Sequence, residues 1–231
     1  MLRDSESAAG PPTSGAKSLT SLAFDRVRTD ILTGRLRPDE RLKIQALSER
    51  YGIGATAIRE ALSRLVSDGL VESEDQRGFM VASISREDLV DLTNTRIDVD
   101  CLAFRRSIER GDVEWETGVA SSLYRLSRTP HPSDADSHVV WATAHRKFHE
   151  SLVAGCGSRW LLRLSATLYD KSERYRNLAE PRTSPDVRDV DSEHRVLAEA
   201  ALARKADQAC ELLAKHFKRT TDIILQAGFT A

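Results

Sequence analysis

The chain has 231 residues, of which 40% are hydrophobic and 30% are charged, and its formal net charge is −1. This length suits one small and one medium domain, and no apolar run approaches the roughly 20 residues of a transmembrane helix, so an integral membrane protein is excluded. Within residues 19–84, ten Lys and Arg balance ten Asp and Glu, so net charge alone does not indicate a nucleic-acid partner.

Residues 1–17 are rich in Ser, Gly and Pro and contain Asp4 and Glu6 without an apolar core. This composition predicts a flexible tail and not a secretory signal, and we expect the protein in the cytoplasm. The three cysteines (Cys101, Cys156 and Cys210) lie far apart in the sequence without a C-x-x-C pair, which indicates reduced, buried thiols.

Residues 18–84 have the pattern of a winged helix-turn-helix. Apolar residues at helical spacing predict a helix over 19–32, which Gly34 and Pro38 end. The segments IQALSERYGI and IGATAIREALSRLVSDGL predict two helices joined at Gly52. Alternating apolar residues around a polar turn in VESEDQRGFMVASI then predict a two-stranded wing.

Residues 85–231 are helical almost throughout, with Ser85 as the predicted N-cap and Asp88 at the third helical position. Breaks at Gly111, 129–133, 155–157, 181–185 and near Lys205 divide the segment into about six helices. The fold class is therefore mainly α, with a winged helix-turn-helix followed by an all-α antiparallel helical bundle.

The second helix of a helix-turn-helix enters the major groove with its N-terminal residues at the base edges. Arg59 is the best candidate base reader, and Thr56 can cap the helix or bind a phosphate. The other predicted DNA contacts are Lys43, Gln45, Arg64, Gln76, Arg77 and Gly78. The alternative for Arg59 and its neighbour Glu60 is a solvated surface pair.

The elements RPDERL, ALSERYGIG, REALSRLVSDGLV and QRGFMV together resemble the GntR family of DNA-binding regulators. The run from Arg59 to Val71 is the most specific part of this resemblance. Many members place an arginine where this chain has Ala55, so the operator sequence of other members does not transfer.

Four histidines fall on three predicted helices of the C-terminal segment. His145 and His149 are four residues apart and project from one helix face, and His194 and His216 lie on later helices. This spacing suits a metal site in the core of a helical bundle. The alternative is that these histidines are exposed or satisfied by core hydrogen bonds.

Residues 85–227 resemble the FCD domain of the FadR subfamily, whose metal-binding members use D-x-x-F-H, E-H-R and a late histidine. The matching residues here are His145 and His149 in HRKFH, His194 in EHR, and His216. His145 stands where the family has Asp, which favours zinc or nickel as the divalent ion.

The resemblance also implies that the metal holds a carboxylate effector and that Arg96 lines its pocket. An intrahelical pair with Asp100 is the alternative role for Arg96. Further pocket candidates are Tyr169, Arg174 and Tyr175 in LYDKSERYR. The stretch VAGCGSRWLLRL resembles a branch of the subfamily that controls organic-acid metabolism, including carbon-starvation repressors.

We therefore expect a homodimeric repressor that binds a double-stranded DNA operator and responds to a small organic acid. The expected organisation is a tail over 1–17, a DNA-binding domain over 18–84, and a ligand-binding and dimerisation domain over 85–231. Two alternatives remain: a regulator for which the metal ion is itself the signal, and a metal-dependent helical enzyme. No nucleophile–base set or phosphate loop supports catalysis.

Overall fold

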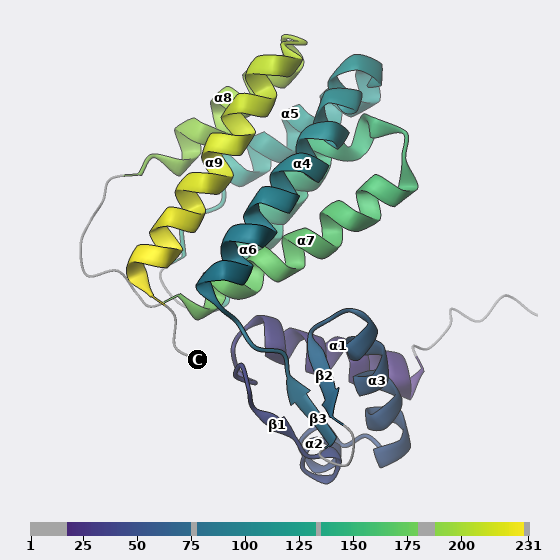
Figure 1. Ribbon diagram of the computed structural model, residues 1–231. Coiled ribbons are helices and arrows are strands. Elements are labelled where there is room, and N and C mark those ends of the chain that lie inside the picture. The colour runs from purple at the N-terminus through teal and green to yellow at the C-terminus, as the bar shows by residue number, and fades with distance from the viewer. Residues whose placement is uncertain (1–17, 75–77, 133–134, 180–187, 229–231) are drawn as a thin grey trace, which may run out of the picture.

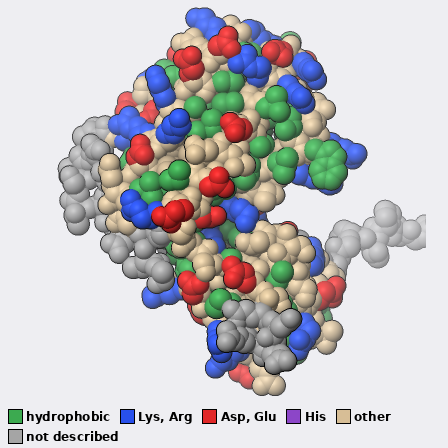
Figure 2. Space-filling model, viewed as in Figure 1, with side chains coloured by type: hydrophobic (Ala, Val, Ile, Leu, Met, Phe, Trp, Pro, Cys, Tyr) green, Lys and Arg blue, Asp and Glu red, His purple; other side chains and the backbone are tan. Residues whose placement is uncertain are grey.

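The computed structural model describes residues 18–74, 78–132, 135–179 and 188–228. Figure 1 shows a small N-terminal part built from helices and a sheet, and a larger C-terminal part built from helices alone. On the face shown in Figure 2, Lys and Arg side chains are interspersed with Asp and Glu side chains over both parts. The chain passes from the first part to the second between β3 (Gly78–Val81) and α4 (Arg86–Arg110).

The N-terminal part contains α1 (Leu19–Leu32), α2 (Ile44–Tyr51) and α3 (Ala55–Ser67), as the periodicity predicts. Ser18 caps α1 by accepting a hydrogen bond from the Ser21 amide at 3.2 Å. Gly52, with φ of 65°, ends α2 in the left-handed region that favours glycine. The three helices share one apolar core with residues of the sheet: Val27, Ile31, Ile58, Leu62, Leu65 and Val81 are all fully buried.

The predicted two-stranded wing is confirmed, and a short third strand adds to it in the described residues. β2 (Val71–Glu74) and β3 pair antiparallel from Val71 opposite Val81 to Glu74 opposite Gly78. β1 (Arg41–Leu42) adds to the other edge of β3, which gives the order β1-β3-β2. A strand of two residues has no detectable alternation, so only its partner in the folded chain reveals it.

The C-terminal part consists of six α-helices within the described residues. After α4 come α5 (Val113–Ser127), α6 (Ala135–Val153), a 3-10 turn (Ala154–Cys156), α7 (Arg159–Leu178), α8 (Val190–Leu202) and α9 (Ala206–Ala227). Ser85 caps α4 by accepting from the Asp88 amide at 3.0 Å, as predicted. The predicted break at 181–185 lies outside the described residues.

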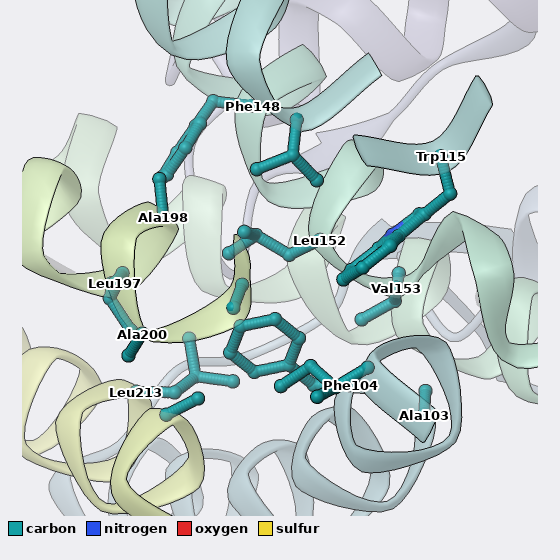
Figure 3. Packing of buried hydrophobic residues seen from close by; sticks show 14 of the residues in the cluster. Ala103, Phe104, Trp115, Phe148, Leu152, Val153, Leu197, Ala198, Ala200 and Leu213 are labelled. Carbon is teal, nitrogen blue, oxygen red and sulfur yellow. The ribbon is translucent and has the colours of Figure 1, made fainter. Parts of the chain in front are cut away.

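An apolar core of large side chains joins these helices (Figure 3). Phe104, Phe148, Leu152, Leu197 and Leu213 are each at most 1% exposed. Burying a side chain of this size stabilises the folded state by about 1.5–3 kcal/mol. No helix in the described ranges is long and apolar enough to cross a bilayer.

The three cysteines are free thiols, but their predicted arrangement is only partly correct. Cys156 is buried, as expected. Cys101 and Cys210 are half-buried and meet between α4 and α9, although 109 positions separate them in the sequence.

Gly111, between α4 and α5, provides a test of this packing. A Cβ at this position would lie 2.4 Å from the Trp115 ring and 2.5 Å from the Ser107 carbonyl oxygen, whereas a Cβ at Gly118 meets nothing within 4 Å. We expect Gly111→Ala to lower the free energy of unfolding by about 1–3 kcal/mol through overpacking. The control Gly118→Ala, inside α5, is expected to raise it by up to about 1 kcal/mol. Urea unfolding followed by circular dichroism measures both, and equal stability of Gly111→Ala and the wild type would contradict this account.

Candidate metal centre and nucleic-acid interface

Three helices bring four histidines to one point inside the bundle. His145 and His149 come from α6, His194 from α8 and His216 from α9, and each is at most 6% exposed. One nitrogen of each ring lies within 4.8 Å of those of the other three, and the Nε2 atoms of His145 and His149 are 3.2 Å apart. The spacing of four residues on α6 places both of its rings on one helix face. This nitrogen cluster could hold a metal ion.

Outer contacts orient these rings. Nδ1 of His216 lies 2.7 Å from Oε2 of Glu193, and this carboxylate also accepts hydrogen bonds from Arg188. An Nδ1 that donates to a carboxylate leaves Nε2 unprotonated for the centre of the cluster. The Tyr169 hydroxyl lies 3.0 Å from Nδ1 of His145.

His194 supplies an independent observation that fits a metal. Neither of its ring nitrogens has a hydrogen-bond partner, although the residue is only 1% exposed. A buried polar atom without a partner is costly, and a bound cation would compensate for it. Four nitrogen donors are a set that suits borderline ions such as zinc or nickel.

The imidazoles are held in the neutral form that binds metal. Burial, first, and the neighbouring histidines and arginines, second, lower the pKa of His145 and His149 well below the usual value. The same causes lower the pKa of His194 to about 2. Burial lowers the pKa of His216 to about 4, although Glu193 acts in the opposite direction.

A polar cavity adjoins the cluster. His149 and His216 form one side, and the remaining lining includes two guanidinium groups and several hydroxyls, from Arg96, Arg176, Thr93, Ser172, Thr220 and Thr221. Nε of Arg96 donates to Asp100 at 3.2 Å and Nη1 donates to Ser172 at 3.1 Å. Arg96 therefore both lines the cavity and forms the intrahelical pair with Asp100, so the two roles foreseen for it are compatible.

The structure separates the other three pocket candidates. Tyr169 borders the histidines, whereas Arg174 and Tyr175 do not line the cavity. Arg174 donates to the Ala82 carbonyl, and Tyr175 donates to Asp88 at 2.6 Å, so both lie where the two parts of the chain meet.

Arg176 lines the cavity but is absent from the pocket residues predicted from the sequence. Tyr169, Ser172 and Arg176 have the i, i+3, i+7 spacing of one helix face. A helical-wheel projection of α7 therefore groups Arg176 with Tyr169 and could have identified it.

Other residues of α7 contact the N-terminal part. Asn177 donates to the Leu32 carbonyl at 2.7 Å, and Lys171 donates to the Gly69 carbonyl at 3.2 Å. Asp170 accepts hydrogen bonds from Arg28 of α1 and from Arg146 of α6. One carboxylate thus joins the N-terminal part to the helix that carries His145 and His149.

The predicted DNA contacts that the structure describes are exposed around the start of α2 and along α3: Lys43, Gln45, Thr56, Arg59 and Arg64. The N-cap of α3 is Gly54, so Thr56 does not cap this helix. Glu60, next to Arg59, accepts a hydrogen bond from Thr20 of α1 at 2.9 Å.

Other members of this predicted set are more constrained or are not described. The Arg64 guanidinium stacks 4.4 Å from the Phe24 ring. Gly78 begins β3 with φ of 89°. Gln76 and Arg77 lie outside the described residues.

Comparisons with known proteins agree with this architecture. Residues 19–81 match the model of the bacterial regulatory proteins of the gntR family, and residues 91–219 match the FCD domain. The chain is 41% identical to the HTH-type transcriptional regulator BphR of Paraburkholderia xenovorans LB400, over 94% of this chain and 89% of the relative. It is 36% identical to the HTH-type transcriptional repressor GlaR of Escherichia coli K12, over 91% and 98%.

A solved structure, E. coli McbR/YncC, shares the fold with a TM-score of 0.75 at 20% identity, over 91% of this chain and 99% of that one. Together with the matched domains, the relatives make this protein a transcription regulator and not an enzyme. The chain belongs to the GntR family of bacterial transcription regulators, with an N-terminal DNA-binding helix-turn-helix and a C-terminal FCD effector-binding domain.

Proposed function

We propose that this protein is a homodimeric repressor whose operator binding is controlled by a small carboxylate held at a divalent metal ion. The observation that carries the proposal is the convergence of four buried, neutral imidazoles next to a cavity containing Arg96. The name of the relative GlaR, a transcriptional repressor, supports the direction of control. Such a regulator acts in the cytoplasm, on chromosomal DNA.

The metal would be held by His145, His149, His194 and His216. When bound, it supplies a Lewis-acidic centre to which a carboxylate oxygen can bind. Because all four donors are neutral nitrogens, zinc or nickel fits better than a hard ion such as magnesium.

Arg96 is suited to bind the other end of such an acid. The residue is 5% exposed, and its guanidinium carbon lies 3.9 Å from the centroid of the Phe217 ring. The planar guanidinium can bind a carboxylate through two hydrogen bonds. Burial lowers the pKa of Arg96, although Asp100 acts in the opposite direction. An anionic ligand would therefore add a second counter-charge in a site that has little access to water.

Helix α7 is the route by which the site would influence DNA binding. Tyr169 and Arg176 lie beside the histidines, and the residues that follow them in the sequence, Asp170 and Asn177, hold the N-terminal part. A ligand that favours one position of α7 would favour the corresponding position of the DNA-binding part, which is what coupling between two sites requires.

Two copies are needed to read an operator with two half-sites, because one recognition helix spans only one major groove. In each copy, α3 would enter the groove with Arg59 at the base edges and Thr56 near a phosphate. Lys43 and Gln45 would bind the backbone at the start of α2, and Arg64 would reach it from the end of α3.

A second candidate function is a metal-responsive regulator. Four protein nitrogens can complete a tetrahedral zinc site without a further ligand, as in closed structural sites. Titration of operator binding with zinc alone distinguishes the two functions, because release by zinc in the absence of any acid would favour this second candidate.

The metal centre predicts the effect of removing single ligands. We expect the wild type to retain about one ion per chain, and His149→Ala and His194→Ala to lose it, because each removes a donor from a buried site. His131→Ala is the control, since His131 is exposed and pairs with Asp191. Metal analysis gives the content, and a thermal-shift screen tests whether carboxylic acids stabilise only the metal-loaded protein. Retention of the ion by both cluster variants would contradict the assignment.

The DNA interface predicts two distinct defects. Arg59→Ala is expected to weaken binding to a duplex selected by the wild type from random sequence by about 1–3 kcal/mol, with little effect on unrelated DNA. Lys43→Ala should weaken binding to both and reduce the salt dependence by about one counterion. Arg195→Ala, on the exposed face of α8, is the charge-matched control. Fluorescence anisotropy measures the affinities, and equal losses on both duplexes for Arg59→Ala would show that it binds only the backbone.

The contacts of α7 predict a variant that still binds metal and acid but whose operator affinity responds less to the acid. Asp170→Asn weakens the link between Arg28 and Arg146, so the acid found in the thermal-shift screen should change operator affinity less than in the wild type. Metal content should be unchanged. Glu150→Gln is the matched control because Glu150 also pairs with Arg146, at 3.4 Å, but does so within α6 itself. An undiminished response in Asp170→Asn would exclude this route.

A further inference from the structure

Helices α4 and α9 pack against each other in an antiparallel arrangement, side by side in Figure 1. At one end the hydroxyls of Thr93 and Thr221 are 2.6 Å apart, and toward the other end Arg105 donates to Asp207 at 2.6 Å. Between these two contacts Cys101 and Cys210 lie opposite each other.

The two cysteines are in mutual contact. Sγ of Cys101 lies 3.5 Å from the Cys210 carbonyl oxygen, and Sγ of Cys210 lies 3.5 Å from the Cys101 carbonyl oxygen. Each sulfur therefore reaches the backbone of the opposite residue, a closeness of the kind that a disulfide requires. The third cysteine, Cys156, contacts Ser158 in the turn before α7.

The surroundings make the two thiols unequal. The hydrogen bond from the Cys101 thiol and the nearby Arg105 guanidinium lower the pKa of Cys210 to about 7, although burial acts in the opposite direction. The same hydrogen bond, together with burial, raises the pKa of Cys101. At neutral pH Cys210 is thus the thiol with more thiolate character, and Cys101 keeps its proton.

The pair is also reachable from solvent. Both cysteines are half-buried, and the neighbouring Leu102 side chain is 44% exposed. The adjacent Arg105 and Asp207 side chains are 40% and 88% exposed. A molecule as small as hydrogen peroxide can therefore approach the two thiols from solvent at this end of the helices.

We propose that Cys101 and Cys210 form a site of reversible oxidation, at which a hydroperoxide converts the two thiols into a disulfide that links α4 to α9. This inference is independent of the metal and of the effector proposed above. Transient disulfides of this kind in reducing compartments usually have a redox-sensing role.

The reaction proceeds in two balanced steps. The Cys210 thiolate attacks one peroxide oxygen, the O–O bond breaks, and the departing hydroxide takes up a proton, which leaves Cys210 as a sulfenic acid. The Cys101 sulfur then attacks the Cys210 sulfur, the S–O bond breaks, and the hydroxide leaves as water with the Cys101 proton. Two thiols lose two electrons in total, and one hydrogen peroxide becomes two waters.

The link would join two walls of the ligand cavity. Arg96 lies on α4 five residues before Cys101, and His216 lies on α9 six residues after Cys210. A covalent bond between these helices would restrict their separation and raise the thermal stability of the oxidised protein.

The test uses the full chain treated with hydrogen peroxide, followed by thiol titration and by peptide mapping without reductant. We expect the wild type to lose two of its three thiols, to yield a cross-linked peptide pair containing Cys101 and Cys210, to melt at a higher temperature, and to revert with dithiothreitol. Cys156→Ala, which removes the buried third thiol, should behave like the wild type.

Two variants identify the roles of the thiols. Cys101→Ser should stop at the sulfenic acid, which a dimedone probe traps on Cys210, whereas Cys210→Ser should leave Cys101 largely unreacted. Three intact thiols in the treated wild type, cross-links only between different chains, or oxidation of Cys210 to the sulfinic acid without a cross-link would each overturn the proposal. Mapping of the wild type alone is decisive if a variant does not fold.

Discussion

The burial of four uncharged imidazoles in a largely apolar bundle is the constraint on which the rest of the C-terminal domain depends. A protonated histidine at this depth would cost several kcal/mol, so the site excludes the charged form and leaves lone pairs that need a partner. One ring nitrogen of His216 is hydrogen-bonded to Glu193, and one of His145 is hydrogen-bonded to Tyr169. Both nitrogens of His194 remain without a hydrogen-bond partner. A bound cation would satisfy these nitrogens, and the proposed metal site would thus explain why four histidines are concentrated at one point in an apolar core.

The charges around the cluster follow from the same constraint. Arg96, Arg176 and Arg188 surround neutral rings, and each arginine has its own carboxylate, in Asp100, Glu173 and Glu193 respectively. The guanidinium groups therefore do not depend on the histidines for a counter-charge. They lower the histidine pKa values further.

The sequence predicted those features that depend on residue type and local spacing. Helix breaks at Gly111 and Lys205, the cap at Ser85 and the four histidines all belong to this group, because a helical face can be read along a single segment. It could not assign the two faces of α7, so Arg174 and Tyr175 were grouped with the pocket although they contact the other part of the chain. The pairing of Cys101 with Cys210 and the addition of Arg41–Leu42 to the wing both depend on how distant segments meet, which local periodicity does not contain.

Two helices carry the connections between these sites, and they meet at the junction of the two domains. Helix α4 holds Arg96 and Cys101 and is capped by Ser85, whose amide donates to the Tyr175 hydroxyl of α7 at 3.2 Å. Helix α7 holds Tyr169 beside His145 and Asp170 against Arg28. A displacement of either helix must therefore disturb the hydrogen bonds at the base of the DNA-binding domain, because a packed core transmits a shift and does not absorb it. Ligand binding at the histidines and cross-linking of α4 to α9 would thus act on the same junction, which gives one DNA-binding domain two chemically separate inputs.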